Sequence, residues 1–204
     1  MLGVILLCGI AGAVVLTVAA GARRSESSLD RFADATASSD VLLDITGADA
    51  TARDEVAASP MVADAGELSI VFALVDGVEQ DLGFFIPNDD HMGVTIEHHR
   101  LLRGRRPAPD RADEVMVNEM AAEAIGVDVG GEIEIATLTP DQINAENYDP
   151  PLGPVVDVHV VGVTRGPEDL FADGEATIAT SPAMFDALSG ADVFATSCSS
   201  SDAQ

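Results

Sequence analysis

The side chains of this sequence that could bind a metal ion lie together between positions 89 and 99. They are two carboxylates and three imidazoles, Asp89, Asp90, His91, His98 and His99. Carboxylate oxygen and imidazole nitrogen are both donors that zinc accepts. However, the histidines do not have the HExxH spacing of a zinc protease, no cysteine joins them, and the segment is polar like an exposed loop. We therefore predict a solvated loop, with a metal site as the alternative.

A cluster of arginines follows this loop directly. It contains half of the ten basic residues of the chain, and its members are Arg100, Arg103, Arg105, Arg106 and Arg111. Such a cluster could dock an acidic partner or lipid phosphates, because guanidinium groups bind anionic oxygens in pairs. It could equally neutralise carboxylates of its own domain, such as Asp110, Asp113 and Glu114. The net charge of −25 favours this second interpretation.

The sequence contains no positive sign of catalysis. His159 alternates with Val158 and Val160, so we expect its side chain to face solvent. There is no G-x-S-x-G elbow, no P-loop and no G-x-G-x-x-G. Gly130 and Gly131 predict a turn, since no GK[ST] follows them. We therefore predict a protein that is not an enzyme, with no catalytic, cofactor-binding or metal-binding residues and no cofactor.

Length and charge limit the classes of protein further. At 204 residues and 47% hydrophobic content, the chain can hold one membrane segment and one domain of ordinary size. The ten basic residues are all arginine, and so acidic a surface disfavours nucleic acid and anionic lipid headgroups as partners. The two cysteines, Cys8 and Cys198, lie at opposite ends of the chain, so no disulfide framework is expected.

The N-terminal segment is long and apolar enough to suggest a membrane helix. Leu2 to Ala22 carries no charged residue, and about 20 helical residues span a bilayer core of roughly 30 Å. The alternative is a cleaved signal peptide, because Ala20-Gly21-Ala22 resembles a cleavage site, although no basic region precedes the apolar run. Arg23 and Arg24 then follow, and the positive-inside rule would place them in the cytoplasm.

The rest of the sequence predicts a mixed domain of short helices and strands. Strands are expected at 40–46, 68–75, 79–86, 114–118, 132–135, 155–163 and 176–180, with a hairpin turn at Asp76-Gly77. Helices are expected at 25–39, 49–59, 119–125 and 182–188, and irregular segments at 87–97, 100–113 and 139–154. The polar residues from Thr196 onward predict a disordered tail.

The most readable part of the domain is a strand, helix, turn and strand between positions 114 and 135. Asn118 is placed to cap a helix that ends at Gly126, which takes a left-handed conformation without a steric penalty. Glu132 to Ile135 alternates, which predicts that Ile133 and Ile135 face the core.

Three stretches also carry a resemblance to a known family. They are GIAGAVVLTVAAGARRSESSLDRFADATASSDVLLDI, RLLRGRRPAPDRADEVMVNEMAAEAIGVDVGGEIEI and PVVDVHVVGVTRGPEDL. In this order they resemble the first membrane helix and the extracytoplasmic core domain of FtsX-like (MacB-type) ABC transporter permeases, especially the actinobacterial branch.

The resemblance implies an α+β fold: a transmembrane helix at 1–22, an extracytoplasmic MacB-like core domain at 23–195 and a disordered tail at 196–204. It implies a non-catalytic part of a permease in the cell membrane, whose outer domain couples ATP-driven conformational change to an outer substrate or partner. The implied partners are a cytoplasmic ABC ATPase subunit, the other transmembrane helices of the permease, and an extracytoplasmic lipid or protein.

The sequence departs from that family because it lacks the later membrane helices, so a fragment is expected. It also leaves two other functions open. One is a self-contained binding domain that is membrane-anchored or secreted, and the other is a metal-dependent enzyme that uses His91, His98 and His99.

Overall fold

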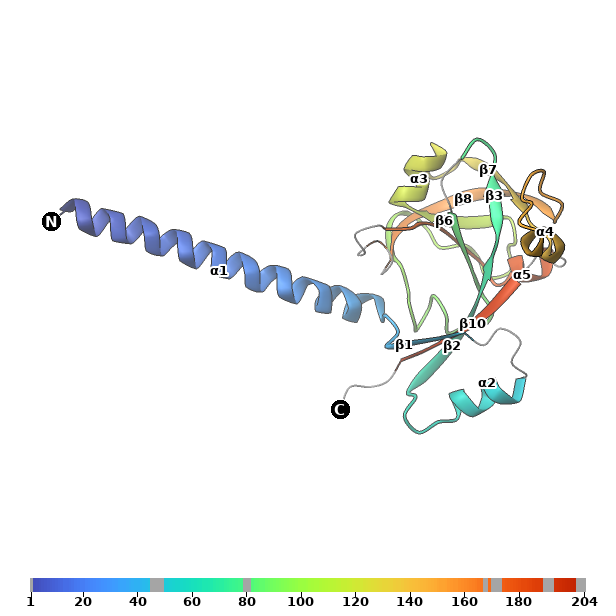
Figure 1. Cartoon of the computed structure of the whole chain (residues 1–204), viewed down its shortest axis with the longest axis horizontal. Coiled ribbons are helices and arrows are strands. Elements are labelled where there is room, and N and C mark those ends of the chain that lie inside the picture. Colours follow the sequence, from blue (N-terminus) through green and yellow to red (C-terminus); the bar gives the residue numbers. More distant parts are fainter. Residues whose placement is uncertain are drawn as a thin grey trace. The chain divides into compact units, whose positions relative to one another are not determined.

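The computed structural model describes residues 2–44, 50–78, 82–166, 169, 174–188 and 193–200. The chain forms two units, Met1–Ala35 and Thr36–Gln204 (Figure 1). The first unit is a helix, and the second is a domain built around a large β-sheet.

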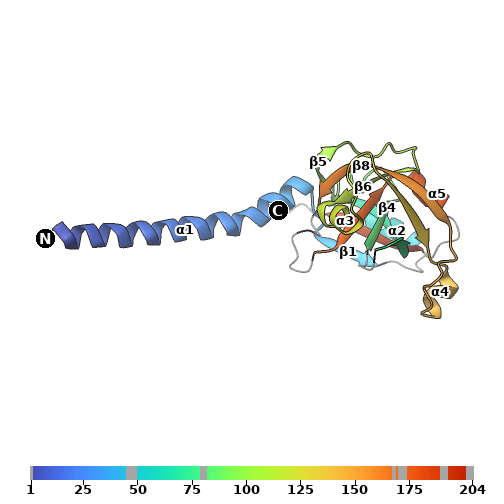
Figure 2. The same ribbon diagram turned by 90° about the horizontal axis from the view of Figure 1, so that it is seen from above.

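The N-terminal helix α1 runs without interruption from Leu2 to Thr36 (Figures 1 and 2). The sequence predicted an apolar helix and a separate polar helix, but nothing breaks the chain between them. No proline occurs in this stretch, and Ser27 Oγ donates to the carbonyl oxygen of Arg23 one turn earlier. Within the residues that the structure describes, no helix meets the length and hydropathy of a membrane span.

In its described residues, the domain has ten strands in one sheet and four short helices. The strands are β1 (Val41–Asp44), β2 (Asp64–Val71), β3 (Ala73–Val75), β4 (Leu82–Pro87), β5 (Arg100–Gly104), β6 (Glu114–Asn118), β7 (Glu132–Thr137), β8 (Val155–Arg165), β9 (Ala176–Thr180) and β10 (Val193–Ser200). The helices are α2 (Ala50–Ala57), α3 (Glu119–Ile125), α4 (Pro140–Asn144) and α5 (Ala183–Ala187). The predicted strand-rich α+β domain with short helices is therefore confirmed.

The strands follow the order β1-β10-β2-β4-β9-β6-β8-β7-β3, and β5 pairs with β8 beyond the end of β7. Most pairs are antiparallel, whereas β4 with β9 and β6 with β8 are parallel. The largest fully buried side chains are aliphatic residues or methionine, apart from Asn118 in β6. This core joins β4, β6, β7, β8 and β9 to α3 and α5.

The predicted unit between positions 114 and 135 is confirmed. Asn118 Oδ1 accepts a hydrogen bond from Ala121 N at 2.8 Å, and Gly126 ends α3 with φ 78°. Ile133 and Ile135 are 7% and 1% exposed, as the alternation predicted. The strand β6 differs from its prediction, because all five of its residues are buried. It is a central strand that pairs with β8 on one edge and β9 on the other.

Three predicted segments have different boundaries. The strand predicted at 68–75 is divided at Phe72 into β2, which pairs with β4 as a hairpin, and β3, which pairs with β7. The irregular connection at 100–113 begins with β5. The predicted loop at 139–154 contains α4, where Thr139 and Gln142 form a capping box. The strands β3 and β5 form by pairing with strands that are distant in the sequence, and α4 is stabilised by its capping box.

The predicted disorder from Thr196 is wrong for residues 196–200. They form the second half of β10, which pairs with β1 on one edge and β2 on the other. A polar strand without alternation is hard to predict, but backbone hydrogen bonds on both edges hold it regardless of its side chains. Residues 201–204 lie outside the described residues.

Candidate functional site

The loop with the histidines is held to the start of β2 by Asp64. His91 Nδ1 lies 2.7 Å from Asp64 Oδ1, and Thr95 Oγ1 donates to Asp64 Oδ2 at 2.7 Å. Burial raises the pKa of Asp64, but the hydrogen bond from Thr95 and the charge of His91 outweigh it and bring that pKa below its ordinary value of 3.8. Asp64 is a partner that the sequence reasoning missed, because it lies far from the loop along the chain.

The carboxylate of Asp89 organises the backbone of the same loop. Its Oδ1 accepts from the backbone N–H groups of His91 and Met92, and its Oδ2 accepts from Glu67 N at 2.7 Å. These bonds leave little of the carboxylate for a metal ion. Within the described part of the chain, no three histidine, cysteine, aspartate or glutamate side chains form a group that could hold one. The five side chains considered as an alternative metal site, from Asp89 to His99, therefore do not form one metal-binding group among the described residues.

The second half of the loop is attached to the domain through the backbone of Glu97 and His98. The backbone N–H of His98 donates to Thr36 O at 2.9 Å, and that of Glu97 donates to Ala37 O at 2.8 Å. Met92 and Ile96 are buried with Leu68 in a small second core beneath the loop. The loop therefore links Thr36 and Ala37, at the start of the domain, to Glu67 in β2.

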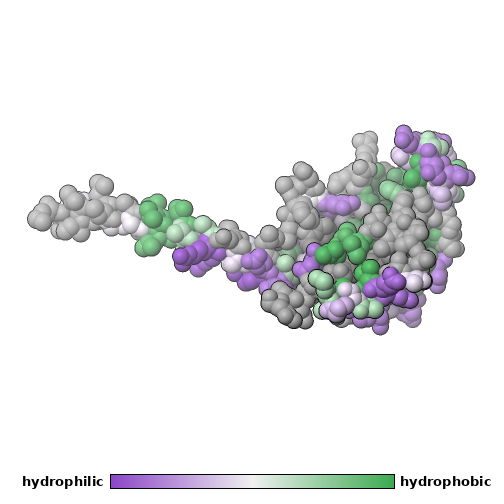
Figure 3. Space-filling view, turned by 60° about the horizontal axis from the view of Figure 1, so that its bottom comes forward, coloured by the Kyte–Doolittle hydropathy of each residue, from purple (hydrophilic) through white to green (hydrophobic). Residues whose placement is uncertain are grey.

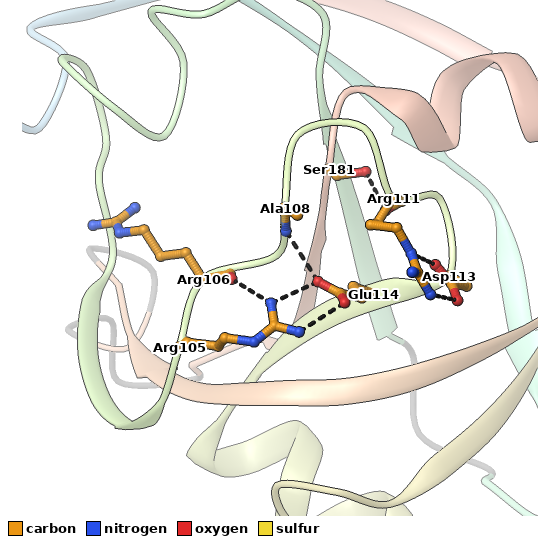
Figure 4. A network of polar contacts seen from close by, with 7 residues as sticks. All are labelled: Arg105, Arg106, Ala108, Arg111, Asp113, Glu114 and Ser181. Atoms are coloured by element: carbon orange, nitrogen blue, oxygen red, sulfur yellow. Dashed lines mark hydrogen bonds and ion pairs between the residues drawn. The ribbon is translucent and has the colours of Figure 1, made fainter.

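The arginine cluster is organised around Glu114, the first residue of β6 (Figure 4). Arg105 binds both carboxylate oxygens of Glu114, with Nη1 at 2.6 Å from Oε2 and Nη2 at 2.7 Å from Oε1. Ala108 N donates to Glu114 Oε2 at 3.0 Å. Glu114 is only 7% exposed. The hydrogen bond from Arg105 is the largest cause of a low pKa of about 2 for Glu114.

A second ion pair continues this network (Figure 4). Arg111 binds Asp113 through Nε and Nη2, and this contact lowers the pKa of Asp113 to about 2. Ser181 Oγ donates to Arg111 O at 2.7 Å. Ser181 directly precedes α5, but its hydroxyl links the arginine segment to the end of β9. No side chain caps α5.

Two further arginines of the cluster also contact their own domain. Arg103 pairs with Asp128 at 3.1 Å. Arg106 donates to the carbonyl oxygens of Gly93 and His99, and so links the arginine cluster to the histidine loop. The prediction that the arginines neutralise carboxylates of the domain is confirmed for Asp113 and Glu114. The hydrogen bond to Asp113 and the charge of Asp110 both contribute to raising the pKa of Arg111.

The Arg105–Glu114 pair predicts a pH dependence of stability. Because the pKa of Glu114 is lowered from 4.5 to about 2, its contribution is present above pH about 4.5 and is lost as the pH falls towards 2. We expect Glu114→Gln to lower the thermal midpoint at pH 7 and to flatten its fall between these pH values. The same acid slope in the variant and the parent protein would contradict a role for this carboxylate, and the exposed Glu123→Gln serves as the control.

His159 and the glycine turn show no catalytic arrangement. His159 is exposed as predicted, and its Nδ1 lies 3.4 Å from Glu132 Oε1 on the neighbouring strand. Gly130 adopts φ 91°, and Gly131 N donates to Asp128 O, which confirms the predicted turn.

Asn118 is a buried polar hub that the sequence identified only as a helix cap. Its Oδ1 accepts from Ala121 N and Thr177 N, and its Nδ2 donates to Asp169 Oδ1 and to Glu175 O. These four hydrogen bonds satisfy the whole amide, so Asn118 holds β6, α3 and the start of β9 together. The buried side chains of Asn118 and Glu114 thus form hydrogen bonds that hold different elements of the domain together.

No protein-family model matches the sequence, and no curated protein matches it. The fold is similar to the extracellular domain of the noncanonic ABC-type transporter YknZ from Gram-positive bacteria, with 11% identity, a TM-score of 0.46 and coverage of 79% of this chain and 82% of that one. It is similar to the periplasmic region of MacB from Actinobacillus actinomycetemcomitans, with 11% identity, a TM-score of 0.45 and coverage of 80% and 74%. A domain assigned to a permease of Porphyromonas gingivalis has 14% identity, a TM-score of 0.43 and coverage of 79% and 70%.

Proposed function

We propose that this chain is the non-catalytic part of an ABC transporter permease, with a first membrane helix at Leu2–Ala22 and a domain on the outer side of the cell membrane. In this proposal a separate cytoplasmic subunit hydrolyses ATP. The other membrane helices of the permease pass the resulting movement to the domain, which acts on an outer lipid or protein partner. The family motifs in the sequence suggest this function.

The pairing of β1 with β10 is the observation that carries the proposal. Val41, the first residue of the first strand, is in register with Ser199 near the end of the last described strand. The chain therefore leaves the sheet beside the point at which it enters. A domain inserted between two membrane helices needs this arrangement, because both connections must return to the same membrane surface.

The composition of α1 supports a membrane location for its first part. Leu2 to Ala22 contains no charged residue, and its side chains Ile10, Val14 and Leu16 are exposed in the isolated helix. Figure 3 shows a hydrophobic band on the helix followed by hydrophilic residues. About 20 residues at 1.5 Å per residue would match the roughly 30 Å bilayer core.

A thiol-labelling experiment tests the side of the membrane on which the domain lies. The Asp90 side chain is 99% exposed. We expect Asp90→Cys, in a Cys8→Ser and Cys198→Ser background, to react with a membrane-impermeant maleimide on intact cells from which any outer permeability barrier has been removed. Val117→Cys, which is buried, should react only after denaturation. Labelling of Asp90→Cys only after lysis would place the domain in the cytoplasm, as Arg23 and Arg24 alone suggest, and would overturn the proposal.

A further inference from the structure

The outward face of β3, β7 and β8 carries a row of apolar side chains at the edge of the sheet. Leu74, Ala136 and Val155 are direct cross-strand neighbours, so their side chains lie on the same face. Leu74 is 39% exposed and Val155 is 54% exposed, although the opposite face of these strands packs into the core. Phe72 is also exposed and lies two residues before Leu74. We refer to these residues as the outer apolar row.

An acidic row lies beside the outer apolar row on the same face. Glu134 and Asp157 are directly opposite each other, two residues from Ala136 and Val155 respectively. Both are exposed, and neither forms an ion pair with the described arginines. Asp76 follows β3 directly and is exposed as well. Like charges at directly opposed positions destabilise a sheet, so this arrangement has a cost within the domain itself.

The two rows lie beside an edge of the sheet. Among the described strands β3 ends the sheet and pairs only with β7. Figure 1 shows β3 beside β7. An edge strand offers unpaired backbone N–H and C=O groups to another extended chain. Charged side chains, lysine above all, usually protect a natural edge. At this edge the charges are acidic and lie beside exposed apolar side chains, so they repel an acidic strand and attract a basic one.

We propose that this face binds an extended segment of a partner protein, which adds to β3 and carries an apolar residue and, two residues away, a lysine or arginine. The period of two in a strand places the apolar residue against the outer apolar row and the basic residue beside the acidic row. Neighbouring strands lie about 4.8 Å apart, so an added strand lies about 4.8 Å from β3 and about 9.6 Å from β7. A basic side chain on it therefore lies next to Asp76, and an extended arginine reaches Glu134 as well.

The charges of the face distinguish this partner from two others. Anionic lipid headgroups would be repelled by Glu134 and Asp157. A second copy of the chain would bring its own Glu134 and Asp157, and an overall charge of −25, to the same face. A basic extended segment removes the like-charge repulsion and covers the apolar side chains at the same time. The proposal relies on the function given above only for the side of the membrane on which the partner lies.

Binding of two synthetic peptides to the purified full chain in neutral detergent tests the proposal. The probe is a fluorescent nine-residue peptide of alternating valine and arginine, and its match has glutamate in place of arginine. We expect only the arginine peptide to bind at low salt, and to protect the backbone amides of Ala73–Val75 from hydrogen exchange. This result does not depend on the side of the membrane, so it is separate from the labelling experiment.

Matched variants distinguish binding at this face from the non-specific attraction of a basic peptide to an acidic protein. We expect Asp76→Asn combined with Glu134→Gln to weaken binding of the arginine peptide about tenfold. The control, Glu55→Gln combined with Glu123→Gln, removes the same charge from exposed positions in α2 and α3 and should weaken it less than twofold. Leu74→Thr, which suits a strand and removes the apolar side chain of β3 itself, should weaken binding while the thermal midpoint changes little.

Four outcomes would overturn the proposal. They are equal binding of both peptides, equal weakening by the two double variants, self-association that Leu74→Thr abolishes, and binding to neutral lipid vesicles that Leu74→Thr abolishes. The third outcome would assign the face to a second copy of the chain, and the fourth would assign it to a lipid surface.

Discussion

Ile133→Asp is expected to unfold the domain or to lower its stability by about 4 kcal/mol or more. Ile133 is buried in β7, and its side chain belongs to the main core. An aspartate at this position would bury a charge that has no basic partner, which is among the largest single-residue effects on stability. Chemical denaturation of the full chain, followed by circular dichroism, measures the change.

The neighbouring residue provides the control for this prediction. Glu132 is exposed and points to the other face of β7, where it lies near His159. We expect Glu132→Gln to change the free energy of unfolding by less than about 0.5 kcal/mol. If the two variants melted at the same temperature, the register of β7 would be wrong, because a shift by one residue exchanges the buried and exposed faces.

The sequence predicted best those elements whose signals are local. Alternation located β7 and β8, and Asn118 and Gly126 marked the ends of α3. These signals depend on the chain's own periodicity and on capping groups within three residues. The central position of β6, whose five residues are all buried, was not predictable in this way, because its pairing partners β8 and β9 come much later in the chain.

The strand β10 illustrates a limit of composition. The run from Thr196 to Ser200 is polar and has no hydrophobic alternation, so it indicated disorder. It is ordered because β1 and β2 leave two edges between which an extended backbone completes the hydrogen bonding. A pattern of side chains cannot reveal a strand that is specified by the backbones of its neighbours.

The charge balance of the sequence predicted the contacts of the arginines, whereas motif spacing did not predict the contacts of the histidine loop. A net charge of −25 makes carboxylate partners abundant, and Arg103, Arg105 and Arg111 each pair with one. The histidine loop lacked such a guide, because its contacts with Asp64 and Thr36 join positions far apart in the sequence. Spacing along a chain gives no information on those contacts.

Asn118→Ala is expected to lower the stability of the domain by about 3 kcal/mol or more. The side chain is 1% exposed and forms four hydrogen bonds, to Ala121 N, Thr177 N, Glu175 O and Asp169 Oδ1. Alanine would leave two buried backbone N–H groups without partners, and each such loss costs roughly 1–3 kcal/mol. It would also remove the cap of α3.

Two further substitutions show whether these hydrogen bonds are the cause. Asn144, at the exposed end of α4, provides the control, and Asn144→Ala should change the free energy of unfolding by less than about 0.5 kcal/mol. Asn118→Asp keeps an acceptor for Ala121 N and Thr177 N but loses both donors and places a second carboxylate where Nδ2 lies 2.7 Å from Asp169. It should therefore also be strongly destabilised at pH 7, and less so at a pH low enough to protonate one of the carboxyls, because the repulsion then ends. Full stability of Asn118→Asp at pH 7 would mean that the bonds to Asp169 and Glu175 contribute nothing, and that Asn118 acts only as the cap that its sequence position suggests.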